Sequence, residues 1–145
     1  MPVPARISLA TLGVADLERS TEFYRALGWP LSSASVPGEV SFFHTAGGIL
    51  AVWGAYALAG DAAVDNPGGP PAYRGVALAV NVGSEAEVDE SFAAVGAAGG
   101  RVTKPPERSE WGGYGGYFAD PDGHLWEIAY NPGWPLGPDG LPELP

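Results

Sequence analysis

The order of expected strands and helices repeats along this chain, and that repeat restricts the fold more than any single motif does. Residues 6–59 predict a strand, a helix and three further strands, and residues 73–132 predict nearly the same order. Equivalent positions are separated by roughly 70 residues. Two such units, each with one helix on its outer face, would place two curved sheets around a cup. We therefore predict one α+β domain, residues 1–145, built from two βαβββ modules.

The first module has clear helix signals between its strands. Apolar residues 6–14 predict the opening strand. Asp16 suits a helix N-cap, apolar residues recur behind it at helical spacing, and Gly28 suits the left-handed residue that ends a helix. Pro-Gly and Gly-Gly turns then separate three expected strands, at residues 30–36, 39–45 and 48–55.

The second module follows a linker without periodicity, residues 60–72, in which Gly and Pro are frequent. Ser84 followed by Glu87 predicts a capping box at the start of the second helix. The strands of this module are expected at residues 73–82, from residue 101, and on both sides of a turn at residues 120–123.

The C-terminal tail, residues 133–145, is rich in proline and is predicted to be neither a helix nor a central strand. Its apolar residues Trp134, Leu136 and Leu141 indicate that it lies against a surface, either its own or that of a partner. A role in reinforcing a dimer is one hypothesis for it.

Composition narrows the class of protein. Hydrophobic residues make up 46% of the chain and charged residues 17%, which is typical of a soluble globular domain. The net charge of −10 argues against nucleic-acid binding and is compatible with a cationic ligand. No apolar run approaches the ~20 residues of a membrane span, and no signal-peptide pattern is present, so we expect a cytoplasmic protein without a membrane partner. The lack of cysteine excludes disulfides and thiolate chemistry.

The segment from Tyr117 to Pro132 carries the strongest local signal. Asp120-Pro121-Asp122-Gly123 predicts a tight turn between two apolar strands. In the second of these strands Glu127 alternates with apolar residues, and a carboxylate in such a strand must be paired, protonated or coordinated. His124 lies in the turn, where a packing or solvated role is expected.

This hairpin resembles the last hairpin of the vicinal oxygen chelate (VOC) superfamily, which includes glyoxalase I, bleomycin resistance proteins and extradiol dioxygenases. The opening segment, residues 12–29 with Phe23-Tyr24 and Leu27-Gly28-Trp29, is similar to the first strand and helix of that family. The resemblance extends over about residues 6–132 and implies the glyoxalase/bleomycin resistance-like fold, a cup of curved sheets.

Metal-using members of the family take one ligand from each of four strands that face the cup. The resemblance places these positions at Leu9, at Leu50 or Ala51, at Gly75 and at Glu127. Of these side chains only the carboxylate of Glu127 can bind a metal, and a divalent ion requires about three protein ligands or more. We therefore expect no metal cofactor. A divalent ion held by Glu127, His44 and aspartates is the alternative.

The remaining cup is expected to be apolar and to carry a single acid. Strand alternation turns Thr11 inward with Leu9, and Ala77 inward with Gly75, while Trp53 and Trp111 offer faces for planar or cationic ligands. Such a cavity is typical of a small-molecule site. The predicted ligand-binding residues are Leu9, Thr11, Trp53, Gly75, Ala77, Trp111 and Glu127.

Two classes of function are compatible with these residues. The first is metal-free binding of a small molecule, for which a cationic or aromatic drug is the candidate ligand, as the resemblance to the bleomycin-resistance branch implies. The second is an enzyme, a lyase or isomerase similar to lactoylglutathione lyase or else a dioxygenase, with Glu127 as its catalytic acid or base. Because members of the family commonly dimerise, a homodimer is expected in either case.

Overall fold

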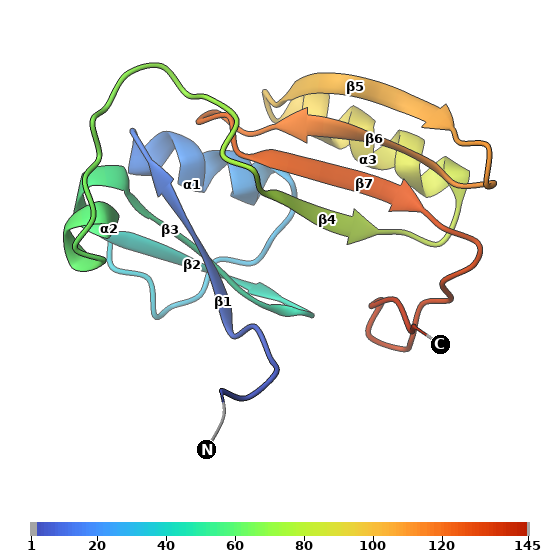
Figure 1. Cartoon of the computed structure of the whole chain (residues 1–145), viewed down its shortest axis with the longest axis horizontal. Coiled ribbons are helices and arrows are strands. Elements are labelled where there is room, and N and C mark those ends of the chain that lie inside the picture. The colour runs from blue at the N-terminus through green and yellow to red at the C-terminus, as the bar shows by residue number, and fades with distance from the viewer. Residues whose placement is uncertain (1–2, 145) are drawn as a thin grey trace.

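The strands of the chain form two separate sheets, one for each module (Figure 1). The computed structural model describes residues 3–144; Met1, Pro2 and Pro145, which the predicted domain and tail included, lie outside the described residues. The predicted α+β class with its two modules is confirmed. The elements in chain order are β1 (Leu9–Val14), α1 (Leu17–Ala26), β2 (Val40–Thr45), β3 (Gly48–Gly54), α2 (Ala55–Asp61), β4 (Ala77–Asn81), α3 (Glu85–Ala97), β5 (Arg101–Arg108), β6 (Tyr114–Ala119) and β7 (Leu125–Tyr130).

The first sheet has the strand order β1-β3-β2, with β1 parallel to β3 and β2 antiparallel to it. Helix α1 covers one face of this sheet. It begins where the Asp16 carboxylate accepts a hydrogen bond from the backbone N–H of Arg19, and Gly28 follows its end with a φ of 89°. Both capping predictions are confirmed, and the left-handed φ explains why glycine stands there.

The second sheet has the order β4-β7-β6-β5, in which β4 and β7 are parallel and the other pairs are antiparallel. Helix α3 covers one of its faces through Val88, Phe92 and Val95, which are all buried. Ser84 caps this helix by accepting from the Glu87 backbone N–H. The Glu87 carboxylate accepts from the N–H of Gly83, one residue before the partner expected in a capping box.

Three elements differ from the sequence-based expectations. The prediction of a strand at residues 30–36 is wrong, because this segment makes only the single bridges Leu31–Phe43 and Val36–Val40. The first sheet therefore has three strands in the described chain. Helix α2 was not predicted, since its alanine-rich sequence follows a strand without a polar cap. Strand β4 begins only at Ala77, because Gly75 adopts a φ of 75°.

The two modules share one hydrophobic core. Phe23 and Tyr24 of α1 pack against Phe118 of β6 and Trp126 of β7, with ring centroids 6.0 to 6.3 Å apart. Helices α1 and α3 lie behind the sheets in the view of Figure 1, so the opposite faces of both sheets open toward the viewer. In the described part of the chain no helix is long and apolar enough to cross a membrane.

Candidate functional site

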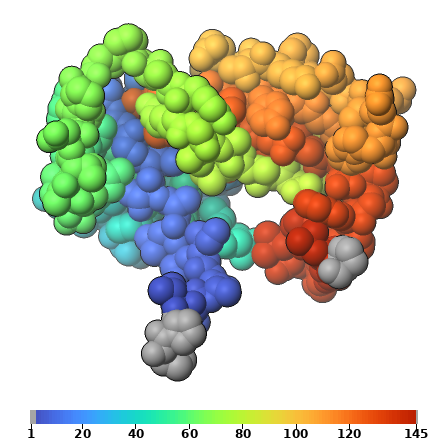
Figure 2. Space-filling view, in the orientation of Figure 1, coloured from blue at the N-terminus to red at the C-terminus, as the bar shows by residue number. Residues whose placement is uncertain are grey.

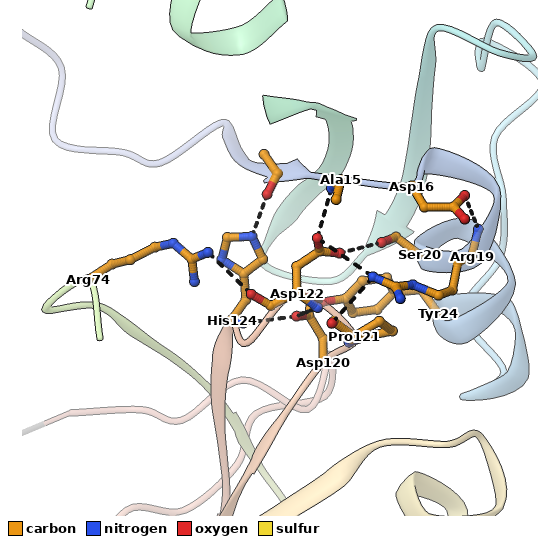
Figure 3. Close-up of polar contacts among 11 residues, drawn as sticks. Ala15, Asp16, Arg19, Ser20, Tyr24, Arg74, Asp120, Pro121, Asp122 and His124 are labelled. Atoms are coloured by element: carbon orange, nitrogen blue, oxygen red, sulfur yellow. Dashed lines mark hydrogen bonds and ion pairs between the residues drawn. The ribbon is translucent and has the colours of Figure 1, made fainter. Parts of the chain in front are cut away.

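The turn between β6 and β7 docks against the start of α1 through two buried aspartates (Figure 3). The carboxylate of Asp122 accepts hydrogen bonds from the Ala15 backbone N–H at 2.7 Å and from the Ser20 hydroxyl at 2.9 Å. The guanidinium of Arg19 lies 3.9 Å from the same carboxylate. A turn in the second module thus satisfies donors at the N-terminal end of a helix in the first.

Asp120 completes the second half of this junction. Its carboxylate accepts from the Tyr24 hydroxyl at 2.7 Å and from the backbone N–H groups of Asp122 and His124. The Tyr24 oxygen in turn accepts from the indole N–H of Trp126 at 3.1 Å. Burial, followed by the negative charge and hydrogen bonding of Asp120, raises the pKa of Tyr24 well above its ordinary value.

His124 ties the turn to the first module. Its Nε2 lies 2.7 Å from the carbonyl oxygen of Gly13, and because a carbonyl can only accept, Nε2 carries the proton. Arg74 donates to the carbonyl of Asp122 from the other side, as Figure 3 shows. A structural role for His124, expected from the sequence, is the one these contacts support.

Glu127 lies half-buried on the face of β7 that is opposite α3. Pairing across the sheet places it between Ala79 of β4 and Tyr117 of β6, and Lys104 of β5 follows next to Tyr117. Burial, then hydrogen bonding to Glu127 and its charge, raises the pKa of Tyr117. The Lys104 ammonium pairs with Glu107 at 2.9 Å on the exposed edge of the sheet.

A groove with a volume of about 570 Å³ opens between the two modules. Figure 2 shows it as a hollow bounded by the chain start, the tip of the β2–β3 hairpin, β4 and the C-terminal tail. Most of its lining is apolar, and its volume lies in the range of roughly 300–1,000 Å³ that is typical of ligand pockets. The lining comes from residues 7–10, 44–50, 78–81 and 139–142, with Trp29, Pro30 and Trp126.

The groove contains only part of the predicted site. Leu9 lines it, and so does Ala79, the neighbour of Glu127 across the sheet. The other predicted binding residues lie elsewhere in the fold. Thr11, Trp53, Ala77 and Glu127 face the same side of their sheets without lining the groove, Gly75 lies in the turn before β4, and Trp111 is 66% exposed in the β5–β6 loop.

The family's metal positions do not provide a suitable donor set. Leu9 and Ile49 are paired neighbours in the first sheet, and His44 lies on the other side of Ile49 in the same row. Among residues 3–144, no group of three or more His, Asp or Glu side chains is placed to hold a metal ion. Glu127 is paired across the sheet with Ala79 and Tyr117, and neither of these residues carries a carboxylate or an imidazole. The residues present therefore do not fit a bound divalent ion.

Sequence reasoning did not predict three contributors to the groove, of which His44 was named only for an alternative metal site. His44 follows from strand alternation, because it shares a face with Leu9. Trp29 was assigned to the end of the first helix without a role in a site, and it packs edge-on against Trp126 with ring centroids 5.3 Å apart. The tail was expected to lie against a surface, but its pattern of prolines gave no indication of which surface.

The chain was compared with known families and structures. The model of the Glyoxalase/Bleomycin resistance protein/Dioxygenase superfamily matches residues 6–128. A glyoxalase-related enzyme from Fulvimarina pelagi is 39% identical, with a TM-score of 0.85 over 97% of this chain and 99% of that one. A glyoxalase/bleomycin resistance protein/dioxygenase from Nocardioides is 33% identical, with a TM-score of 0.74 over 94% and 93%.

Lactoylglutathione lyase from Agrobacterium tumefaciens shares the fold at 24% identity, with a TM-score of 0.65 over 89% of this chain and 96% of that one. The comparison with functionally curated proteins gave no match.

Proposed function

Because the chain belongs to the glyoxalase/bleomycin resistance protein/dioxygenase superfamily, we propose that it binds a small molecule, without a metal, in the groove between its modules. The observation that carries the proposal is the large apolar groove, together with the lack, among residues 3–144, of any group of three or more His, Asp or Glu side chains placed to hold a metal ion. A ligand there would contact the indole of Trp29 and the small side chain of Ala79.

The electrostatics of the groove favour a neutral or cationic ligand. In the described chain, Asp139 is the one lining residue with a formal charge, and His44 is the one imidazole. The net charge of −10 adds a field that attracts cations over longer distances. A planar aromatic molecule, neutral or with an amino group, is the proposed ligand class.

A blocked groove tests this proposal directly. Ala79→Trp would fill the groove from β4, whereas Ala77→Trp adds the same side chain on the same face of the same strand without lining the groove. We expect Ala79→Trp to weaken binding of the neutral fluorescent probe phenylnaphthylamine by at least about tenfold, and Ala77→Trp by less than about twofold. Equal affinities in both variants would contradict the proposal, as would loss of binding after treatment with EDTA.

An enzyme is the second candidate, and one observation favours it. Tyr117 and Glu127 are paired residues of β6 and β7, and the carboxylate of Glu127 contributes to the raised pKa of the Tyr117 phenol, an arrangement that could move a proton during a lyase or isomerase reaction. Isomerisation of an α-keto hemithioacetal to an α-hydroxy thioester that Glu127→Gln abolishes would support this reading. A ligand recovered unchanged would support binding alone.

We further propose a homodimer. Ile7 precedes β1, Tyr73 and Val76 precede β4, and all three side chains are more than 60% exposed. Large exposed apolar side chains are typical of interaction surfaces. A molar mass of two chains by light scattering is expected, and a monomer at micromolar concentration would contradict the assignment.

A further inference from the structure

The C-terminal tail supplies one wall of the groove from beyond the residues that the family model matches. The family match ends at residue 128, and the lining residues 139–142 lie beyond it. In Figure 2 the tail closes the side of the hollow that faces the β2–β3 hairpin. This wall is therefore built from a segment that the family model does not describe.

The tail holds its own shape through internal hydrogen bonds. The Gly137 N–H donates to the Leu141 carbonyl at 2.8 Å, and the Glu143 N–H donates to the Pro135 carbonyl at 2.9 Å. The Asp139 carboxylate accepts from the Leu141 N–H at 3.1 Å. Within the described structure, every hydrogen bond of residues 131–144 has both partners in that segment. Prolines at four of these positions stiffen the loop further.

The tail contacts the rest of the protein through apolar packing instead. Leu141 approaches Gly47 at the tip of the β2–β3 hairpin, where a Cβ added to the glycine would lie 3.4 Å from the leucine Cδ2. Because this attachment contains no hydrogen bond to the body, the tail can be displaced as a unit without leaving a polar group unpaired. Leu141 and Asp139 thus lie on a wall that, in the described structure, meets the body through apolar contact rather than through hydrogen bonds.

We propose that this tail is the specificity-determining wall of the groove, with Leu141 setting its apolar length and Asp139 excluding ligands that carry a negative charge. The inference rests on the proposed small-molecule function and names the feature that selects the ligand. The ligand class is a planar apolar molecule without an anionic group. A carboxylate beside a partly desolvated ligand repels a sulfonate or carboxylate more strongly than it would in bulk water.

Two probes with the same ring system separate shape from charge. Phenylnaphthylamine is neutral, and anilinonaphthalene sulfonate adds one negative charge. We expect Asp139→Asn to tighten binding of the sulfonate about fivefold at low salt and to change binding of the neutral probe less than about twofold. Glu143→Gln is the matched control, since Glu143 lies in the same segment but does not line the groove, and it should leave the ratio of the two affinities unchanged.

The apolar contact has its own pair of variants. Leu141→Ala should weaken binding of both probes about fivefold, and deletion of residues 133–145 about tenfold, because the ligand loses buried apolar contact on one side. Leu144→Ala, outside the groove lining, should have less than a twofold effect, to about the precision of such titrations. Circular dichroism checks that each variant keeps the fold.

The outcomes distinguish the specificity role of the tail from the proposed binding of a small molecule in the groove. If the native protein binds phenylnaphthylamine and Ala79→Trp blocks it, but Asp139→Asn and Leu141→Ala behave like their controls, the specificity role of the tail is wrong while the groove function stands. If the native protein binds neither probe, both are wrong. A changed affinity ratio in Asp139→Asn together with weaker binding in Leu141→Ala supports the inference.

Discussion

The turn at residues 120–123 and the strand face that carries Glu127 are neighbours in sequence, yet they differ in almost every physical respect. Asp120 and Asp122 are buried, and their carboxylates accept hydrogen bonds from both modules. Glu127 is half-buried, lies between Ala79 and Tyr117, and faces the open side of the sheet. The most recognisable motif of the chain therefore holds the modules together, while Glu127 lies on a partly exposed strand face.

The difference in burial between the turn and the strand face separates residues that stabilise the fold from residues that are free to vary with function. Removing a buried carboxylate leaves the donors around it without a partner, so the turn tolerates little change. A half-exposed side chain on a strand face can change at small cost. The contrast is measurable residue by residue.

The largest expected effect comes from the turn. Asp122→Ala should lower the free energy of unfolding by about 3 kcal/mol, because the Ala15 N–H and the Ser20 hydroxyl lose a charged acceptor in a buried place. Urea titration measures the change. Asp65→Ala, in the exposed linker, is the control and should change stability by less than about 0.5 kcal/mol. If Asp122→Ala lowered the free energy of unfolding as little as Asp65→Ala does, the turn would not be more sensitive to substitution than the exposed surface.

The next effect comes from the tyrosine bound to the turn. Tyr24→Phe should cost about 1.5 kcal/mol, since Asp120 loses a donor and the Trp126 N–H loses an acceptor. Denaturation midpoints at neutral pH give this number. Tyr114→Phe, whose hydroxyl binds Asp89 on the surface, should cost less than about 0.5 kcal/mol.

Tyr24 also gives a pH dependence. Its pKa is raised in the folded protein, so above about pH 10 the unfolded chain loses this proton while the folded chain keeps it. Stability is unaffected by this group below pH 10 and should fall above it, by up to about 1.4 kcal/mol per pH unit. The Tyr24→Phe variant should show a shallower alkaline slope by about one proton. If the free energy of unfolding fell equally steeply with pH in the native protein and in Tyr24→Phe, Tyr24 would not be the cause of this pH dependence.

The smallest effect is expected at Glu127. Glu127→Gln should change the free energy of unfolding by less than about 0.5 kcal/mol and leave binding of phenylnaphthylamine within about twofold, because the residue does not line the groove. Calorimetry and probe titration measure both. Loss of probe binding, or loss of a catalysed reaction, would place chemistry on the strand face after all.

The sequence predicted the architecture because its signals are local and periodic. Asp16, Gly28 and Ser84 mark helix ends through their own backbone chemistry, and the turn at residues 120–123 follows from its Pro and Gly. The prediction of a strand at residues 30–36 was wrong because a segment becomes a strand only when a neighbouring strand pairs with it through a series of backbone hydrogen bonds. Here the segment meets β2 at single bridges.

The site was predicted less completely for a related reason. Leu9 was found from the family pattern, and the absence of donors at the matching positions was read from side-chain chemistry alone. Trp29 and the tail line the groove through contacts between segments that are far apart in sequence. The contact between Leu141 and Gly47 is one example, and no local sequence pattern predicts it. Such contacts depend on the assembled shape.

The metal content of the purified protein tests the central claim most directly. Untagged protein prepared without chelator would be examined by elemental analysis for Ni, Zn, Fe and Mn, beside the Glu127→Ala variant. Binding without a metal predicts far less than one equivalent of any of these per chain in both proteins. Close to one equivalent in the native protein, lost in Glu127→Ala, would contradict the account and return the strand face to metal-dependent chemistry.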